Sequence, residues 1–134
     1  SQSSRLGQQK CQKWYSSPQA FTYAVSRAYA DGRAKNLEKV SLRISYFLLS
    51  TQRKDGSWGN ELETALACVS LINFNYSGIQ LDKGIQFLLS HQNANDGSWP
   101  AAFFFLGPLG YYASEELTTA ISLEALAKYK KANF

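Results

Sequence analysis

The chain has 134 residues, 45% of them hydrophobic and 18% charged, with a formal net charge of +4, as is typical of one globular domain with its own core. No run of about 18 uncharged apolar residues occurs, and no apolar leader opens the chain, so the sequence argues against a transmembrane helix and a signal peptide. Its basic residues form no stripe interleaved with aromatic residues, and we therefore expect no nucleic-acid partner.

The first 16 residues are polar and lack periodicity, which predicts a flexible leader over residues 1–16 before a repeat domain over 17–134. The chain starts with Ser and contains no Met, so we expect that it was processed, trimmed or excerpted. Cys11 lies in the leader and Cys68 in an apolar helix. We expect two unpaired thiols, which favour a reducing compartment such as the cytoplasm.

Hydrophobic periodicity predicts five helices in chain order, at about residues 18–30, 37–51, 60–74, 79–91 and 114–130. Ser17-Pro18 resembles an N-cap followed by proline at the first helical position, and Asn60 with Glu63 has capping-box character. The first, third and fifth helices are apolar on most faces, whereas the second and fourth are amphipathic. This alternation predicts an all-α fold with inner and outer helical layers, a partial α/α toroid that forms an open arc.

The end of the second helix and the end of the fourth share one motif. RISYFLLSTQRKDGSW runs from Arg43 to Trp58 and KGIQFLLSHQNANDGSW from Lys83 to Trp99, about 40 residues later, a period typical of repeat proteins. We expect each glutamine amide to satisfy backbone groups at the helix end, and each glycine to permit a positive φ. Each tryptophan then covers the junction. The motif predicts a structural staple between helices, made by Arg43, Phe47, Gln52, Gly56 and Trp58, and again by Lys83, Gly84, Phe87, Gln92, Gly97 and Trp99.

These residues resemble the glutamine–tryptophan (QW) motif of squalene-hopene cyclases, oxidosqualene cyclases and related class II terpene cyclases. The likeness extends over roughly residues 18–131, and the first copy departs from the pattern once, with Ile44 where the family prefers Gly or Ala. The resemblance implies an α-toroid built from prenyltransferase/squalene oxidase repeats. It implies further that the chain is the C-terminal part of a polyprene or triterpene cyclase, or of a cyclase-like protein.

The segment PAAFFFLGPLGYYA, between Trp99 and Ser114, fits neither layer and is too irregular for a helix. In related cyclases, loops near the inner helix ends line an apolar cavity for a polyprene, and aromatic faces stabilise a carbocation. The resemblance therefore implies an apolar substrate-binding lining. A second interpretation is that these rings cover the open arc or bind a partner. The aromatic residues are Phe103, Phe104, Phe105, Tyr111 and Tyr112.

The chain lacks the Asp-rich motif, D-x-D-D, with which class II cyclases protonate their substrate, and its aspartates are scattered. Prenyltransferases on the same fold bind zinc through an Asp-x-Cys pair, but Leu66 stands two residues before Cys68, and His91 lies inside the repeat motif. Glu61 and Glu63 lie two residues apart on a helix and point in different directions. We therefore expect no catalytic residue, no metal ligand and no cofactor in this chain.

Two hypotheses follow. The chain is either a segment of a class II terpene cyclase (an isomerase or lyase), not catalytic alone, that supplies scaffold and aromatic lining, or it is a non-catalytic module. In the second case its apolar face binds a lipophilic ligand or a protein partner. Both hypotheses leave room for an isoprenoid ligand, for another chain or segment that completes the toroid, and for peripheral contact with a membrane.

Overall fold

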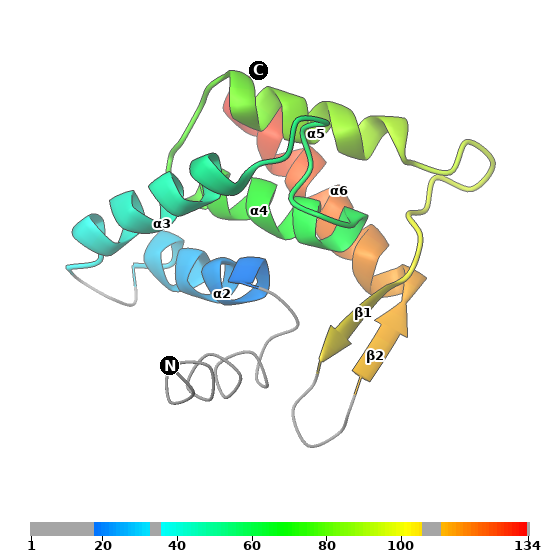
Figure 1. Cartoon of the computed structure of the whole chain (residues 1–134), viewed down its shortest axis with the longest axis horizontal. Coiled ribbons are helices and arrows are strands. Elements are labelled where there is room, and N and C mark those ends of the chain that lie inside the picture. Colours follow the sequence, from blue (N-terminus) through cyan, green and yellow to red (C-terminus); the bar gives the residue numbers. More distant parts are fainter. Residues whose placement is uncertain (1–17, 33–35, 106–110, 134) are drawn as a thin grey trace.

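The structure, a computed structural model, describes residues 18–32, 36–105 and 111–133, without the side chains of 103–105 and 111–113. The predicted leader, the Ser17 cap and Cys11 lie outside these residues. The fold is all-α, as predicted, and the predicted helices agree with the observed ones to within a few residues (Figure 1). The described helices are α2 (Pro18–Ala30), α3 (Glu38–Thr51), α4 (Glu61–Asn73), α5 (Ile79–Ser90) and α6 (Glu115–Asn133).

The helices lie in two layers. Helix α4 packs between α2 and α6 in the first layer, and these are its most extensive contacts (Figure 1). Helix α3 contacts α2 and α4, and α5 contacts α4 and α6, so the second layer covers the seams of the first. The first, third and fifth predicted helices thus form one layer and the second and fourth form the other, which is consistent with an open arc.

Helix α4 is the centre of the core. Ten of its thirteen residues are buried, and its small residues Ala65, Ala67 and Cys68 let neighbouring helices approach closely. Its start is defined by the predicted capping box, which the structure confirms. The Asn60 side chain accepts the Glu63 N–H at 2.8 Å, and Glu63 accepts the Asn60 N–H at 3.2 Å.

The prediction that α2 and α6 are apolar on most faces holds only in part, because their most deeply buried residues are mostly small, while Leu117, Ile121 and Leu126 of α6 are partly buried. Phe21 and Leu123 are 51% and 50% exposed. Small residues pack closer to α4 than large apolar ones can, and several buried hydroxyls are satisfied within their own helix, as when Thr22 Oγ1 donates to the Gln19 carbonyl at 2.9 Å. The buried residues are Gln19, Ala20, Thr22 and Ser26 in α2, and Thr118, Ser122 and Ala125 in α6.

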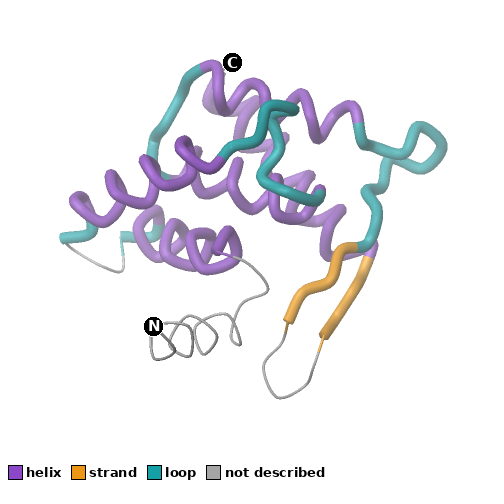
Figure 2. The backbone as a smooth tube through the Cα atoms, in the orientation of Figure 1, coloured by secondary structure: helices purple, strands orange, loops and turns teal. Residues whose placement is uncertain are grey.

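The segment before α6, expected to be irregular, contains a short β-hairpin (Figure 2). Strand β1 (Ala102–Phe105) pairs antiparallel with β2 (Tyr111–Ser114), with Ala102 opposite Ser114. Aromatic residues are strong strand formers, and Gly and Pro between the two aromatic runs favour a reversal. The hairpin leads directly into α6, where Ser114 Oγ accepts the Leu117 N–H at 3.1 Å, as expected of a cap.

Replacing Asn60 by Ala tests the capping box. The variant leaves the Glu63 N–H without its acceptor, so we expect the free energy of unfolding to fall by about 1 kcal/mol, measured by urea denaturation. Asn95→Ala, in an exposed turn, is the matched control and should change that value by less than about 0.5 kcal/mol. An equal loss in both variants would contradict a specific role for Asn60.

Candidate functional site

The first repeat junction joins the end of α3 to the start of α5 through one glutamine. Gln52 Nε2 donates to the Gly56 carbonyl at 3.0 Å and to the Gln80 carbonyl, in the first turn of α5, at 2.8 Å. One amide group therefore fixes the turn and orients the next outer helix.

A tryptophan closes the same junction toward the inner layer. Trp58 Nε1 donates to the Leu48 carbonyl in the last turn of α3 at 2.7 Å, and the Trp58 backbone N–H donates to Thr64 Oγ1 in α4 at 3.0 Å. The ring is buried. It satisfies a carbonyl that the end of the helix would leave without a partner, and it joins α3 to α4.

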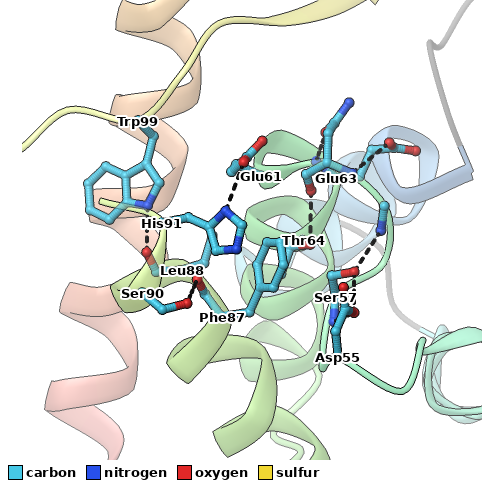
Figure 3. A network of polar contacts seen from close by, with 12 residues as sticks. Asp55, Ser57, Glu61, Glu63, Thr64, Phe87, Leu88, Ser90, His91 and Trp99 are labelled. Carbon is cyan, nitrogen blue, oxygen red and sulfur yellow. Dashed lines mark hydrogen bonds and ion pairs between the residues drawn. The ribbon is translucent and has the colours of Figure 1, made fainter. Parts of the chain in front are cut away.

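The second junction repeats this geometry. Trp99 Nε1 donates to the Leu88 carbonyl at 2.8 Å (Figure 3). The Trp99 backbone N–H donates to Thr119 Oγ1 at 2.9 Å. Gln92 Nε2 donates to the Gly97 carbonyl at 2.9 Å. The two sequence copies thus form equivalent hydrogen bonds, and their chemistry is structural.

The aspartates of both turns accept hydrogen bonds from nearby serines. Asp55 Oδ1 accepts the Ser57 hydroxyl at 2.7 Å and its backbone N–H at 2.9 Å, and Asp96 accepts the same two groups of Ser98 at 2.7 and 3.0 Å. These bonds hold the pKa of both carboxyls below the ordinary value. Carboxyl groups of this kind are poor proton donors.

Glycine lets α5 approach the first junction. A Cβ on Gly84 would lie 2.7 Å from the Cys68 sulfur and 2.9 Å from Cζ3 of Trp58. The close packing buries Cys68 completely, and this burial raises the pKa of its thiol. Cys68 is therefore a packing residue and a poor nucleophile.

The remaining motif residues do not all gather in one site, although Lys83 and Phe87 line the same open pocket on α5. Arg43 and the side chain of Lys83 are exposed on different helices, and Phe47 is largely exposed on α3. Phe87 stacks on His91 with 4.0 Å between ring centres, and His91 Nδ1 lies 3.1 Å from Glu61 Oε1, so the imidazole sits between a ring and a carboxylate (Figure 3). Among the described residues, no three His, Cys, Asp or Glu side chains cluster in a way that could hold a metal ion.

The side chains proposed as an aromatic lining, Phe103 to Phe105, Tyr111 and Tyr112, lie outside the described residues, although their backbones form the hairpin. Its position is informative. Ala102, the first residue of β1, packs in a buried apolar cluster with Ala20 of α2 and with Leu62 and Leu66 of α4. The hairpin therefore begins at the apolar contact between the helices of the first layer.

The sequence analysis missed a polar network that links α2, α4 and α6. Asn73 Nδ2 donates to Ser26 Oγ at 3.1 Å, and Lys128 Nζ donates to Asn73 Oδ1 at 2.7 Å. The Tyr23 hydroxyl donates to Glu124 Oε1 at 2.9 Å, and Lys128 pairs with Glu124 at 3.4 Å. Burial and the bond to Glu124 raise the pKa of Tyr23, which therefore remains a neutral donor.

This network is a set of mutually satisfied groups. Each charge has an opposite charge or a polar partner, so it can orient the three helices without offering a free acid or base. The sequence contains a signal for it, since Thr22 and Ser26 share one helical face with Gln19, and such a polar stripe on an apolar helix indicates buried hydrogen bonds.

No described helix is both long and apolar enough to cross a bilayer.

A comparison with protein families matched none of them to this chain, and no curated protein matched it either.

Gly56 and Gly97 form a matched pair for testing the junctions. Both have positive φ, 91° and 75°, so Ala at either position incurs similar backbone strain of about 1–2 kcal/mol. A Cβ on Gly56 would also lie 2.7 Å from the Lys83 carbonyl oxygen, whereas a Cβ on Gly97 meets only Gln92 Nε2, at 3.4 Å. We expect Gly56→Ala to lower the free energy of unfolding by about 1–3 kcal/mol more than Gly97→Ala, measured by urea denaturation. Equal losses would contradict the close approach of α5.

The two turns also predict a pH dependence. A carboxyl whose pKa is lower in the folded state stabilises the fold above its unfolded pKa, about 3.9 for Asp, and that contribution is lost as the pH falls through the folded pKa. We expect the thermal midpoint to fall on acidification below about pH 4, and Asp55→Asn with Asp96→Asn to flatten that decline. Glu38→Gln leaves both turns intact and is the control. An unchanged slope in the double variant would refute this origin.

Proposed function

We propose that this chain is a toroid repeat segment of the class II terpene cyclase type, which supplies scaffold and an apolar aromatic lining for an isoprenoid while the proton donor comes from elsewhere. The main support is the equivalence of the two junctions. Each tryptophan donates its indole N–H to a carbonyl of the preceding outer helix and its backbone N–H to a threonine of the following inner helix. A coincidental DGSW sequence has no reason to produce this pairing twice.

The position of the hairpin supports the lining. Ala102 packs with Leu62 and Leu66 on the inner layer, and the aromatic residues follow it directly in β1. Leu117 and Ile121 of α6 pack against the same cluster. A lipophilic ligand beside the hairpin would meet the partly exposed Leu117 and Ile121 of α6, and burial of apolar area would drive its binding.

Four carboxylates of this chain have structural partners, which supports a limited role for the chain by itself. Asp55 and Asp96 accept hydrogen bonds in turns, Glu63 caps α4, and Glu116 accepts the Ser114 hydroxyl at 2.8 Å, which lowers its pKa. A strong acid for alkene protonation needs a protonated carboxyl near the substrate. These contacts favour the second candidate function, a non-catalytic module that binds a lipophilic ligand or a protein.

Incubation with squalene in detergent micelles tests the proposal. We expect the chain alone to retain squalene and to form no cyclised product, measured by gas chromatography with mass detection after gel filtration. Phe104→Ala should weaken retention about tenfold because it removes a large apolar ring. Leu42→Ala, at a leucine 72% exposed on α3, is the matched control and should retain squalene normally.

Each other outcome is informative. A cyclised product from the chain alone would show that it contains an acid and would overturn the non-catalytic candidate. Failure to retain squalene or a prenyl diphosphate would overturn the isoprenoid lining and favour a protein partner.

A further inference from the structure

The two repeat junctions differ in what lies outside them. At the first, Gln52 donates to its own turn and also to the Gln80 carbonyl in the first turn of α5. At the second, Gln92 donates to the Gly97 carbonyl, and no other described group accepts from its amide. The second junction therefore presents a donor at the position where the first one holds the start of an outer helix.

The glycines of the turns differ in the same sense. Gly56 is buried, and the Lys83 carbonyl of α5 lies so near that a Cβ would come within 2.7 Å of it. Gly97 is only partly buried, and no backbone of a neighbouring helix lies within 4 Å of the same position. Helix α5 thus covers the Gly56 turn, whereas no described helix covers the Gly97 turn, although the Trp99 ring beside it is fully buried.

The inner helices α4 and α6 also differ in whether the equivalent position is buried or exposed. Thr64 accepts the Trp58 N–H, and Cys68, four residues after Thr64, is buried against Gly84 of α5. Leu123 stands in the same relation to Thr119, the acceptor for Trp99, yet it is 50% exposed. Leu89 is 45% exposed on α5, seven residues after Asp82, which binds Tyr129 of α6 at 2.7 Å. Residues seven apart share a helical face, so Leu89 faces the α6 side of the arc.

We propose that this open edge, formed by Leu89, Gln92, Gly97 and Leu123, binds an amphipathic helix of another polypeptide chain in the way that α5 is bound at the first junction. The partner helix begins near Gln92 and offers a first-turn carbonyl to its amide. Its apolar face covers Leu89 and Leu123, and a small residue passes the Gly97 turn. The contacts of α5 at the first junction are the template for this interface, because the open edge is the equivalent surface one repeat later.

A second copy of the chain has no described helix to spare for this role. Its outer helices are committed, α3 through the fully buried Leu48 and α5 through Leu81, Ile85 and Leu88. Releasing either helix would expose the core, at a cost that one edge contact does not repay. This inference adds a partner helix to the repeat arc of the proposed function. It rests on the geometry of the repeats and does not require that the chain takes part in any reaction.

A labelled peptide with the sequence of residues 76–91, which contains α5, is the probe, and fluorescence anisotropy with the full chain is the measurement. We expect saturable binding that Leu123→Asp weakens about tenfold or more, because it places a charge against the apolar face of the peptide. Gln92→Ala should weaken it about fivefold through the loss of one hydrogen bond. Leu42→Asp, at a leucine that is 72% exposed on α3, is the control and should bind normally. Circular dichroism verifies that each variant is folded.

Absence of saturable binding to the folded chain overturns the proposal. Binding that neither Leu123→Asp nor Gln92→Ala weakens also overturns it, because the peptide would then occupy another surface or replace α5. A concentration-dependent dimer that Leu123→Asp abolishes would assign the edge to self-association instead. Squalene retention by Leu123→Asp is expected to equal that of the unmodified chain, so failure here is distinguishable from failure of the isoprenoid proposal.

Discussion

The structure depends on how short helices satisfy the backbone groups at their ends. Each outer helix ends beside a tryptophan whose indole N–H binds a carbonyl of its last turn, at 2.7 Å for Leu48 and 2.8 Å for Leu88. The same residue reaches the threonine of the next inner helix through its backbone. Two donors of one residue therefore join consecutive helices, and the large ring excludes water from these bonds.

Close packing around α4 is the second constraint. Small residues on α4 admit α2 and α6 on either side, and Gly84 admits α5 against Trp58 and Cys68. Residue types that are reactive in many other proteins contribute to packing here. The Cys68 thiol is enclosed, and hydroxyls of Thr22 and Ser26 bind carbonyls of their own helix. These two hydroxyls are thus buried with their hydrogen bonds made, whereas Gln19 Oε1 and Ser122 Oγ are buried with no hydrogen-bond partner among the described residues.

Function was harder to predict from the sequence than the helices and their junctions were. The repeated motif identified the junctions because Gln, Gly and Trp at fixed spacing have few uses besides joining helices. The aromatic segment showed that the chain leaves the helical pattern, but strand pairing depends on register between Ala102 and Ser114, which periodicity does not encode. The sequence did not predict the polar network. Its pairs, Ser26 with Asn73 and Tyr23 with Glu124, are far apart in sequence, and none of these four residues is unusual by itself.

The sequence by itself determined the elements whose causes are local: five helices, the capping box of Asn60, the alternation of apolar and amphipathic helices, and the two Gln–Trp turns. Tertiary structure decided which face each helix buries, since the most deeply buried residues of α2 and α6 are mostly small, while Leu117 and Ile121 of α6 are only partly buried beside α4. It also decided that the two equivalent turns differ, because α5 covers Gly56 and no described helix covers Gly97. Local hydrogen bonding follows from neighbouring residues, whereas the closest approach of two helices depends on side chains tens of residues apart.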